Sequence, residues 1–180
     1  MKVYIALFRG INVGGRNKLP MGELVKALEG LGLREIKTYI QSGNVVFQSE
    51  EENIAELSER MSNAIKKSHG FMPKTIILRL EEIESAMQAN PYPEAENVPK
   101  TLHLYFLTTE PENPNIETLE NIKTESERYT IKERVFYLHA PDGIGRSKLA
   151  ANVEKGLGVS ATARNWRSVC KIYEMAKSTN

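Results

Sequence analysis

The strongest constraint on the fold is an order of apolar runs and helix signals that occurs twice along the chain. In the first copy, the apolar run Val3–Phe8 predicts a buried strand, and apolar residues at helical spacing after Pro20 predict a helix. Ile36–Gln41 and Asn44–Gln48 then predict a strand pair joined by a tight turn. A second amphipathic helix and the strand Thr75–Leu80 complete the copy. The order is therefore strand, helix, strand, strand, helix, strand.

The second helix of this copy has start and stop signals of its own. Ser49 and Glu52 have the spacing of a capping box at its start, and Gly70 is a natural stop. The residues expected to face the core are Ile54, Leu57, Met61 and Ile65.

The second half repeats much of this order. Its expected elements are the strand Leu102–Leu107, a helix opened by Pro114, the hairpin strands Arg128–Ile131 and Val135–His139, a helix that ends at Gly158, and a weak strand within Val159–Ala163. A further helix from about Asn165 places Trp166 and Cys170 on its apolar face, so we expect both side chains to be buried.

This duplicated order is that of the ferredoxin-like fold. We therefore predict an α+β protein of two ferredoxin-like (βαββαβ) halves, residues 1–80 and 81–180, whose antiparallel sheets are backed by helices. The second half is expected to have a remodelled end and an extra C-terminal helix.

Composition limits the class of protein. Hydrophobic residues make up 41% of the chain and charged residues 26%, which is ordinary for a globular protein. The chain has no signal-peptide pattern and no apolar run near the ~20 residues that a bilayer requires. Its one cysteine, Cys170, forms neither an internal disulfide nor a multi-thiolate metal site. We expect a cytoplasmic monomer or weak dimer with no membrane partner.

The net charge of +1 hides an uneven distribution. Residues 1–22 hold four basic and no acidic side chains, and residues 143–173 hold six basic and one acidic. Residues 23–142 hold 13 basic and 21 acidic side chains. Two basic segments separated by an acidic one predict a polarised surface.

The first candidate site follows the first strand, where residues 9–18 read RGINVGGRNK. The spacing of Gly10 and Gly15 resembles a P-loop, but Arg16 and Asn17 stand where lysine and a hydroxyl residue are needed, so we reject a triphosphatase loop. Two interpretations stay open. Glycine-rich backbone can point N–H groups at an anion, or the loop can be a flexible one with solvated cations. The candidate ligand-binding residues are Arg9, Asn12, Gly14, Gly15, Arg16 and Lys18.

The turn at residues 41–44 is first a hairpin turn, with Gln41, Ser42 and Asn44 as candidate ligand contacts. In an antiparallel βαββαβ sheet, the end of the first strand and the turn between the second and third lie at the same edge. We therefore expect residues 9–18 and 41–44 to converge.

Two further candidates lie at helix starts in the second half. Arg146, Ser147 and Lys148 precede or open a helix whose N-terminus favours an anion, although Asp142 or Ser147 capping that helix explains the motif equally well. Arg164 and Asn165 lie at a strand-to-helix junction, where Arg164 either contacts phosphate or pairs with acidic residues. We expect Arg9, Arg16, Gln41, Ser42, Asn44, Arg146 and Lys148 to line one cleft between the halves.

Metal and nucleophile chemistry gain little support. His69, His103 and His139 follow no ligand spacing, so no metal or cofactor is expected. Ser42 or Ser147 becomes a nucleophile only beside a histidine and an orienting acid.

Four motifs together resemble a known family. They are RGINVGG from residue 9, YIQSGNVVF from residue 39, DGIGRSKL from residue 142 and TARNW from residue 162. In this order they resemble a bacterial family known as domain of unknown function 1697. The resemblance implies a two-part α+β fold with ferredoxin-like character and carries over no activity.

The favoured function is binding of a phosphate-bearing ligand, either a nucleotide or nucleic acid, in a basic cleft. Near-neutral total charge and the absence of an RNA-binding aromatic motif count against nucleic acid. An enzyme acting on a small phosphorylated or carboxylated metabolite and an interaction module for an acidic protein partner are the alternatives.

Overall fold

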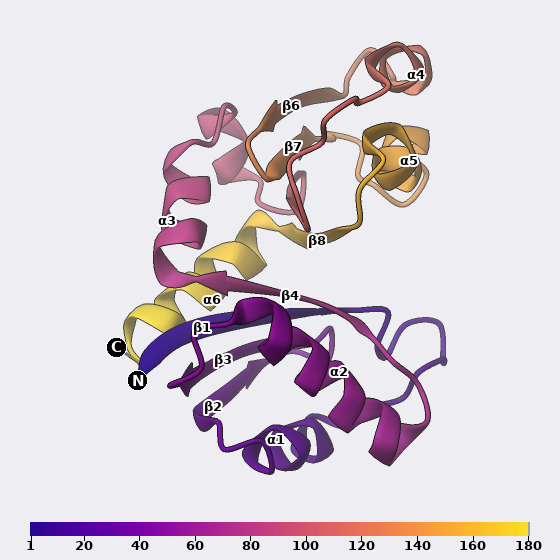
Figure 1. Cartoon of the computed structure of the whole chain (residues 1–180). Coiled ribbons are helices and arrows are strands. Elements are labelled where there is room, and N and C mark those ends of the chain that lie inside the picture. Colours follow the sequence, from indigo (N-terminus) through magenta and orange to yellow (C-terminus); the bar gives the residue numbers. More distant parts are fainter. Residues whose placement is uncertain (180) are drawn as a thin grey trace. The chain divides into compact units, whose positions relative to one another are not determined.

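The computed structural model describes residues 1–179, which form two compact units (Figure 1). The first unit comprises Met1–Glu84 and the C-terminal segment from Lys171, and the second comprises Ser85–Cys170. The sequence predicts a boundary at residue 80 with the C-terminal helix in the second half. In the structure, the end of the chain packs with the first unit, where the Gln48 side chain donates a hydrogen bond to the Thr179 carbonyl over 2.9 Å.

The first unit is a four-stranded antiparallel sheet with two helices on one face. Its elements are β1 (Lys2–Arg9), α1 (Met21–Glu29), β2 (Arg34–Tyr39), β3 (Asn44–Ser49), α2 (Ile54–His69) and β4 (Lys74–Arg79). The strand order is β2-β3-β1-β4, with every neighbouring pair antiparallel. Strand β1 occupies the interior because its apolar run supplies buried side chains to both faces.

The core of the first unit lies between the sheet and α1 with α2. Tyr4, Ala6 and Phe8 project from β1 into this cluster. As predicted, α2 contributes Leu57, Met61 and Ile65 as buried residues, and Ile54 packs half-buried against the same cluster. Figure 1 shows the C-terminal half of helix α6 (Trp166–Lys177) on the opposite side of the sheet.

The predicted start of α2 is wrong by one turn. Strand β3 extends to Ser49, which pairs with Lys2, and the Ser49 hydroxyl accepts a hydrogen bond from the Glu51 N–H over 3.0 Å. The capping residue is instead Asn53, whose side-chain oxygen accepts from the Glu56 N–H. Strand pairing therefore takes precedence over the Ser49–Glu52 capping box. Gly70 ends the helix in the left-handed conformation, as predicted.

The second unit repeats the architecture. Its elements are the end of α3 (Leu80–Gln88), the 3₁₀ helix η1 (Pro93–Asn97), β5 (Leu102–Leu107), α4 (Ile116–Ile122), β6 (Arg128–Lys132), β7 (Val135–His139), α5 (Lys148–Leu157), β8 (Ala161–Asn165) and the start of α6. The strand order β6-β7-β5-β8 has the same connectivity as the first sheet. Its helix-side core gathers Tyr105, Phe136 and Leu138 from the sheet with Leu119 and Val153 from α4 and α5.

The fold prediction is confirmed: two four-stranded antiparallel sheets are each backed by helices. The last strand, predicted to be weak, is the five-residue β8, which pairs with β5 as β4 pairs with β1. Helix α6 is the extra C-terminal element. Among the described residues, none of the helices combines the length and apolar character needed to cross a bilayer.

Candidate functional site

Asparagine side chains fold the β1–α1 loop of the first unit. The Asn12 side chain donates to the carbonyls of Leu19 (2.8 Å) and Gln41 (2.9 Å) and accepts from the Leu19 N–H (2.8 Å). Asn17 donates to the Gly10 carbonyl over 2.9 Å. Both side-chain N–H groups of Asn12 thus donate to backbone carbonyls of the protein. The role of Asn12 is therefore to hold the loop in shape, and its N–H groups are not available to a ligand.

The two glycines at the tip of this loop serve a tight turn. The Arg16 N–H donates to the Val13 carbonyl over 3.1 Å, and Gly14 and Gly15 between them have φ of 59° and 74°. Such left-handed backbone is accessible to glycine without strain. The turn leaves the side chains of Arg16 and Lys18 exposed.

The turn between β2 and β3 meets this loop, as the topology predicts. Besides the Asn12–Gln41 bond, the Phe8 N–H donates to the Gly43 carbonyl over 2.8 Å. A Cβ on Gly43 would lie 2.6 Å from Ile11 Cδ1, so only glycine allows this close approach. Gly43 therefore has a structural role, because it lets the turn pack against β1 and the β1–α1 loop.

Asn44 is the first residue of β3, directly after this turn. It is buried, and its amide donates to the Tyr39 carbonyl and to the Ser42 hydroxyl. Of the predicted ligand contacts in the first unit, Arg9, Gly14, Gly15, Arg16, Lys18, Gln41 and Ser42 are exposed or half-buried.

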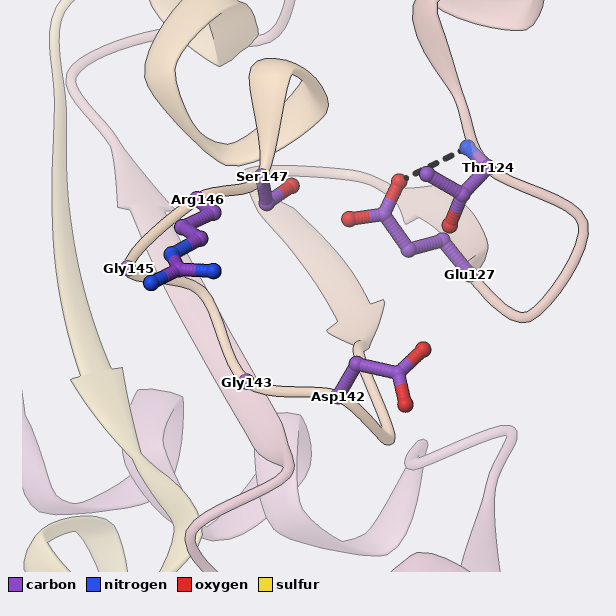
Figure 2. Close-up of a pocket in the computed structure, with 7 residues that line it drawn as sticks. All are labelled: Thr124, Glu127, Asp142, Gly143, Gly145, Arg146 and Ser147. Carbon is purple, nitrogen blue, oxygen red and sulfur yellow. Dashed lines mark hydrogen bonds between the residues drawn. The ribbon is translucent and has the colours of Figure 1, made fainter.

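The second unit contains a pocket of about 500 Å³ between the β7–α5 loop and the turn after α4 (Figure 2). Its lining residues are Thr124, Glu127, Asp142, Gly143, Gly145, Arg146 and Ser147. Figure 2 shows the Arg146 side chain on one side of the pocket and the carboxylates of Glu127 and Asp142 on the other. The pocket therefore combines a cation with two acidic groups.

The two acidic groups are fixed by the turn that precedes β6. Glu127 is buried, and one carboxylate oxygen accepts from the Thr124 N–H over 2.9 Å. Asp142 accepts from the Ser126 hydroxyl over 2.7 Å. Thr124 and Glu127 were not among the predicted site residues, because nothing in their local pattern indicates that this turn folds toward the β7–α5 loop.

Ser147 is the N-cap of α5. Its hydroxyl accepts from the Ala150 N–H over 2.9 Å, which supports the capping interpretation of the DGIGRSK motif. Lys148 and Leu149 lie in the first turn of α5. Their N–H groups have no acceptor within the helix, because no helical carbonyl precedes them by four residues. The positive end of the helix thus lies beside the pocket, and Arg146 and Lys148 are both exposed next to it.

Arg164 and Asn165 lie on β8, outside this pocket lining. Asn165 accepts from the Ser168 N–H over 2.9 Å and so helps to start α6. Arg164 donates to the Ala163 carbonyl, and burial lowers the pKa of its guanidinium to about 10. Trp166 is buried as predicted, whereas Cys170 is half-buried.

The three histidines have separate structural surroundings. His69 contacts Ser68 and Glu23, and His139 contacts Arg128. Within residues 1–179, no group of three His, Cys, Asp or Glu side chains is arranged to hold a metal ion.

The structure thus brings the predicted residues together in two sets. Arg9, Asn12, Gly14, Gly15, Arg16, Lys18, Gln41, Ser42 and Asn44 lie at one end of the first sheet, and Arg146, Ser147 and Lys148 lie at the start of α5. The two sets belong to different units, and the common cleft for both stays a prediction.

Comparison with known proteins supports the architecture. A family model described as "Protein of unknown function (DUF1697)" matches residues 1–137. A solved structure described as the conserved bacterial protein SP0830 from Streptococcus pneumoniae is 25% identical, with a TM-score of 0.71, and the match covers 97% of this chain and 98% of that one. A search of curated proteins gave no match.

Proposed function

We propose that this chain, which belongs to the DUF1697 family of proteins of unknown function, binds a small phosphate-bearing ligand in the pocket of its second unit. The observation that carries the proposal is the composition of the pocket: the start of α5 and Arg146 on one side, and two carboxylates on the other. A helix N-terminus beside an arginine favours an anionic group.

The carboxylates indicate what else the ligand carries. Asp142 and Glu127 repel a second anion but accept hydrogen bonds from hydroxyl or amino groups. A nucleotide supplies both kinds of group, with its phosphate toward Arg146 and its sugar hydroxyls toward the acids. A volume of about 500 Å³ also falls within the usual range for small-ligand sites.

The same carboxylates disfavour nucleic acid at this pocket. A polynucleotide presents a phosphate at every step, and binding it relies on neutralising many of these charges. Here the lining has one basic residue, Arg146, against two acidic ones. We therefore favour a mononucleotide over a nucleic-acid strand.

A second candidate function has one observation in its favour. The Glu127 carboxylate is buried and lines the pocket, where a carboxylate can act as a general base on a small phosphorylated or carboxylated metabolite. The test is to incubate the protein with phosphate esters and to measure product release. Release by the wild type that is lost in Glu127→Gln would favour an enzyme over a binding module.

The binding proposal is tested by calorimetric titration with AMP, ADP, ATP and inorganic phosphate. We expect a nucleotide to bind more tightly than phosphate alone, and Arg146→Ala to weaken it about tenfold or more, because a hydrogen bond to a charged group contributes about 1.5–3 kcal/mol. Lys155→Ala is the matched control, since this lysine is exposed at the far end of the same helix. Equal affinities in both variants, or no heat with any nucleotide, would contradict the proposal.

A further inference from the structure

Three loops meet at one end of the first sheet and form what we call the loop end: residues 10–20, 40–43 and 70–73. The antiparallel pairings place the end of β1, the β2–β3 turn and the start of β4 together, with Arg9 opposite Lys74 and Leu7 opposite Asn44. Figure 1 shows the β1–α1 and α2–β4 connections on the same side of the first unit.

The loop end exposes aliphatic side chains. Val13, Ile40 and Met72 have exposed fractions of 63%, 51% and 51%, and each comes from a different one of the three loops. Single exposed apolar residues are ordinary on protein surfaces, whereas here three exposed aliphatic residues come from three loops that meet at one end of the sheet.

The loop end is also positively charged. Arg16 and Lys18 are exposed beside Val13, and the three loops contain no aspartate or glutamate. The carboxylate of Glu23, in the first turn of α1, contacts the His69 ring. The opposite end of the sheet differs, because the β3–α2 connection there carries Glu50, Glu51 and Glu52.

We propose that the loop end is a docking surface for a protein segment that carries acidic and aliphatic side chains together. Aliphatic contacts at the centre with arginine around them are typical of protein interfaces. Opposite charge on the partner would accelerate association and select the partner. This surface is formed by residues of the first unit, whereas residues of the second unit line the pocket.

Two features favour a protein segment over nucleic acid. Binding of single strands relies on exposed aromatic rings, and Phe71, the one aromatic residue of these loops, packs against the helix-side core. In addition, Val13, Ile40 and Met72 offer aliphatic surface that a phosphate backbone does not use. A protein segment with acidic and apolar residues matches both the charge and the apolar surface.

The first test selects random peptides of about 12 residues on the full-length chain, because a short segment can carry both acidic and aliphatic side chains. We expect enrichment of sequences that combine Asp or Glu with Leu, Ile, Val or Met. A synthetic enriched peptide should shift the methyl NMR signals of Val13, Ile40 and Met72. Enrichment of basic or purely polar sequences, or no enrichment, would overturn the proposal.

Variants separate this surface from the pocket. Arg16→Glu with Lys18→Glu should weaken peptide binding about tenfold or more through charge repulsion, and Val13→Ser with Met72→Ser should weaken it as well. Lys155→Glu is the matched charge reversal in the second unit and should leave peptide affinity unchanged, as should Arg146→Ala. Peptide binding lost equally in Lys155→Glu would show general charge attraction and refute the docking surface.

The same protein samples also test two other occupants of the loop end, nucleic acid and a second copy of the chain. A single-stranded oligonucleotide that shifts the same three methyl signals at lower concentration than the peptide would assign the surface to nucleic acid. Dimerisation in sedimentation that Arg16→Glu abolishes, with no peptide binding, would assign it to a second copy of the chain. Either result overturns the proposal.

Discussion

At the scale of single residues, His103 on β5 is a buried histidine whose charge state depends on folding. The residue is 7% exposed, and its Nδ1 atom has no hydrogen-bond partner within the part of the chain that the structure describes. Burial lowers its pKa to about 4, from an ordinary value of 6.5. Above pH 6.5 both the folded and the unfolded chain are neutral here. As the pH falls from 6.5 toward 4, only the unfolded chain binds the proton, so folding is destabilised.

We therefore predict that His103→Leu reduces the acid sensitivity of the protein. Wild type should lose about 3 kcal/mol more unfolding free energy than the variant between pH 7 and pH 4, a figure that follows from the difference between the two pKa values. Urea unfolding of both proteins across this range measures the difference, with the series above pH 7 as the internal control. Parallel pH profiles would show that His103 is protonated in the folded state.

Residue roles were predictable where the reason was local. Gly43 was expected from hairpin-turn chemistry, and Ser147 was one of the two residues expected to cap α5. Glu127 was not predictable, because its place in the pocket depends on a turn that folds toward Asp142, and no spacing rule reports such an approach.

At the scale of elements, α4 and α5 approach closely because Gly156 has no side chain. A Cβ at this position would lie 2.4 Å from Leu119 Cδ2 and 2.8 Å from its Cγ. Alanine generally favours a helix over glycine by about 1 kcal/mol, whereas overfilling a packed core costs about 1–3 kcal/mol. The steric cost should exceed the gain in helix propensity.

We predict that Gly156→Ala lowers the unfolding free energy by up to about 2 kcal/mol, the steric cost less the gain in helix propensity. Gly22→Ala is the matched control, because this helical glycine in α1 has open space around it and should gain stability or stay neutral. Adding Leu119→Ala to Gly156→Ala should cost less than Leu119→Ala alone, since the new methyl fills part of the cavity. Chemical denaturation of the four variants checks this, and simple additivity would mean that the helices shift apart instead.

Element boundaries show where sequence patterns succeed. Leu102–Leu107 was predicted to the residue because a strand buried on both faces is mostly apolar, and only His103 interrupts the apolar run here. The start of α2 was wrong because Ser49 and Asn53 both suit a cap, and pairing of Ser49 with Lys2 decides between them. Such a choice depends on a strand 47 residues away.

At the scale of the whole molecule, the duplication copied the fold but not the candidate sites. The loop end of the first unit lies where β1 ends, whereas the pocket of the second lies after β7, the counterpart of β3. The equivalent connection in the first unit is the acidic β3–α2 segment with Glu50, Glu51 and Glu52. The two halves are therefore functionally different on our proposals, and the repeated element order alone gave no sign of it.

The chain also returns to its first unit at the end, which makes the C-terminal segment part of that unit's stability. From α6, Ile172 and Ala176 are buried, and the Tyr173 hydroxyl donates to Glu84 over 2.7 Å. Thr179 accepts hydrogen bonds from Lys37 and Gln48. Burial of one isoleucine contributes about 1.5–3 kcal/mol and each hydrogen bond about 1 kcal/mol, so the segment contributes on the order of 5 kcal/mol.

A chain that ends at Cys170 should consequently lose protection in the first unit alone. We expect faster amide hydrogen exchange in β1 and β3, while β5 and β7 of the second unit keep their protection, because compact units open separately. Ile172→Ala should give the same pattern at smaller amplitude, by about 2–4 kcal/mol. Lys171→Ala, on the exposed side of the same helix, is the control and should change exchange little. Equal loss of protection in β5 and β7 would mean that the two units unfold as one, and the division at Glu84 and Lys171 would then not describe how the protein opens.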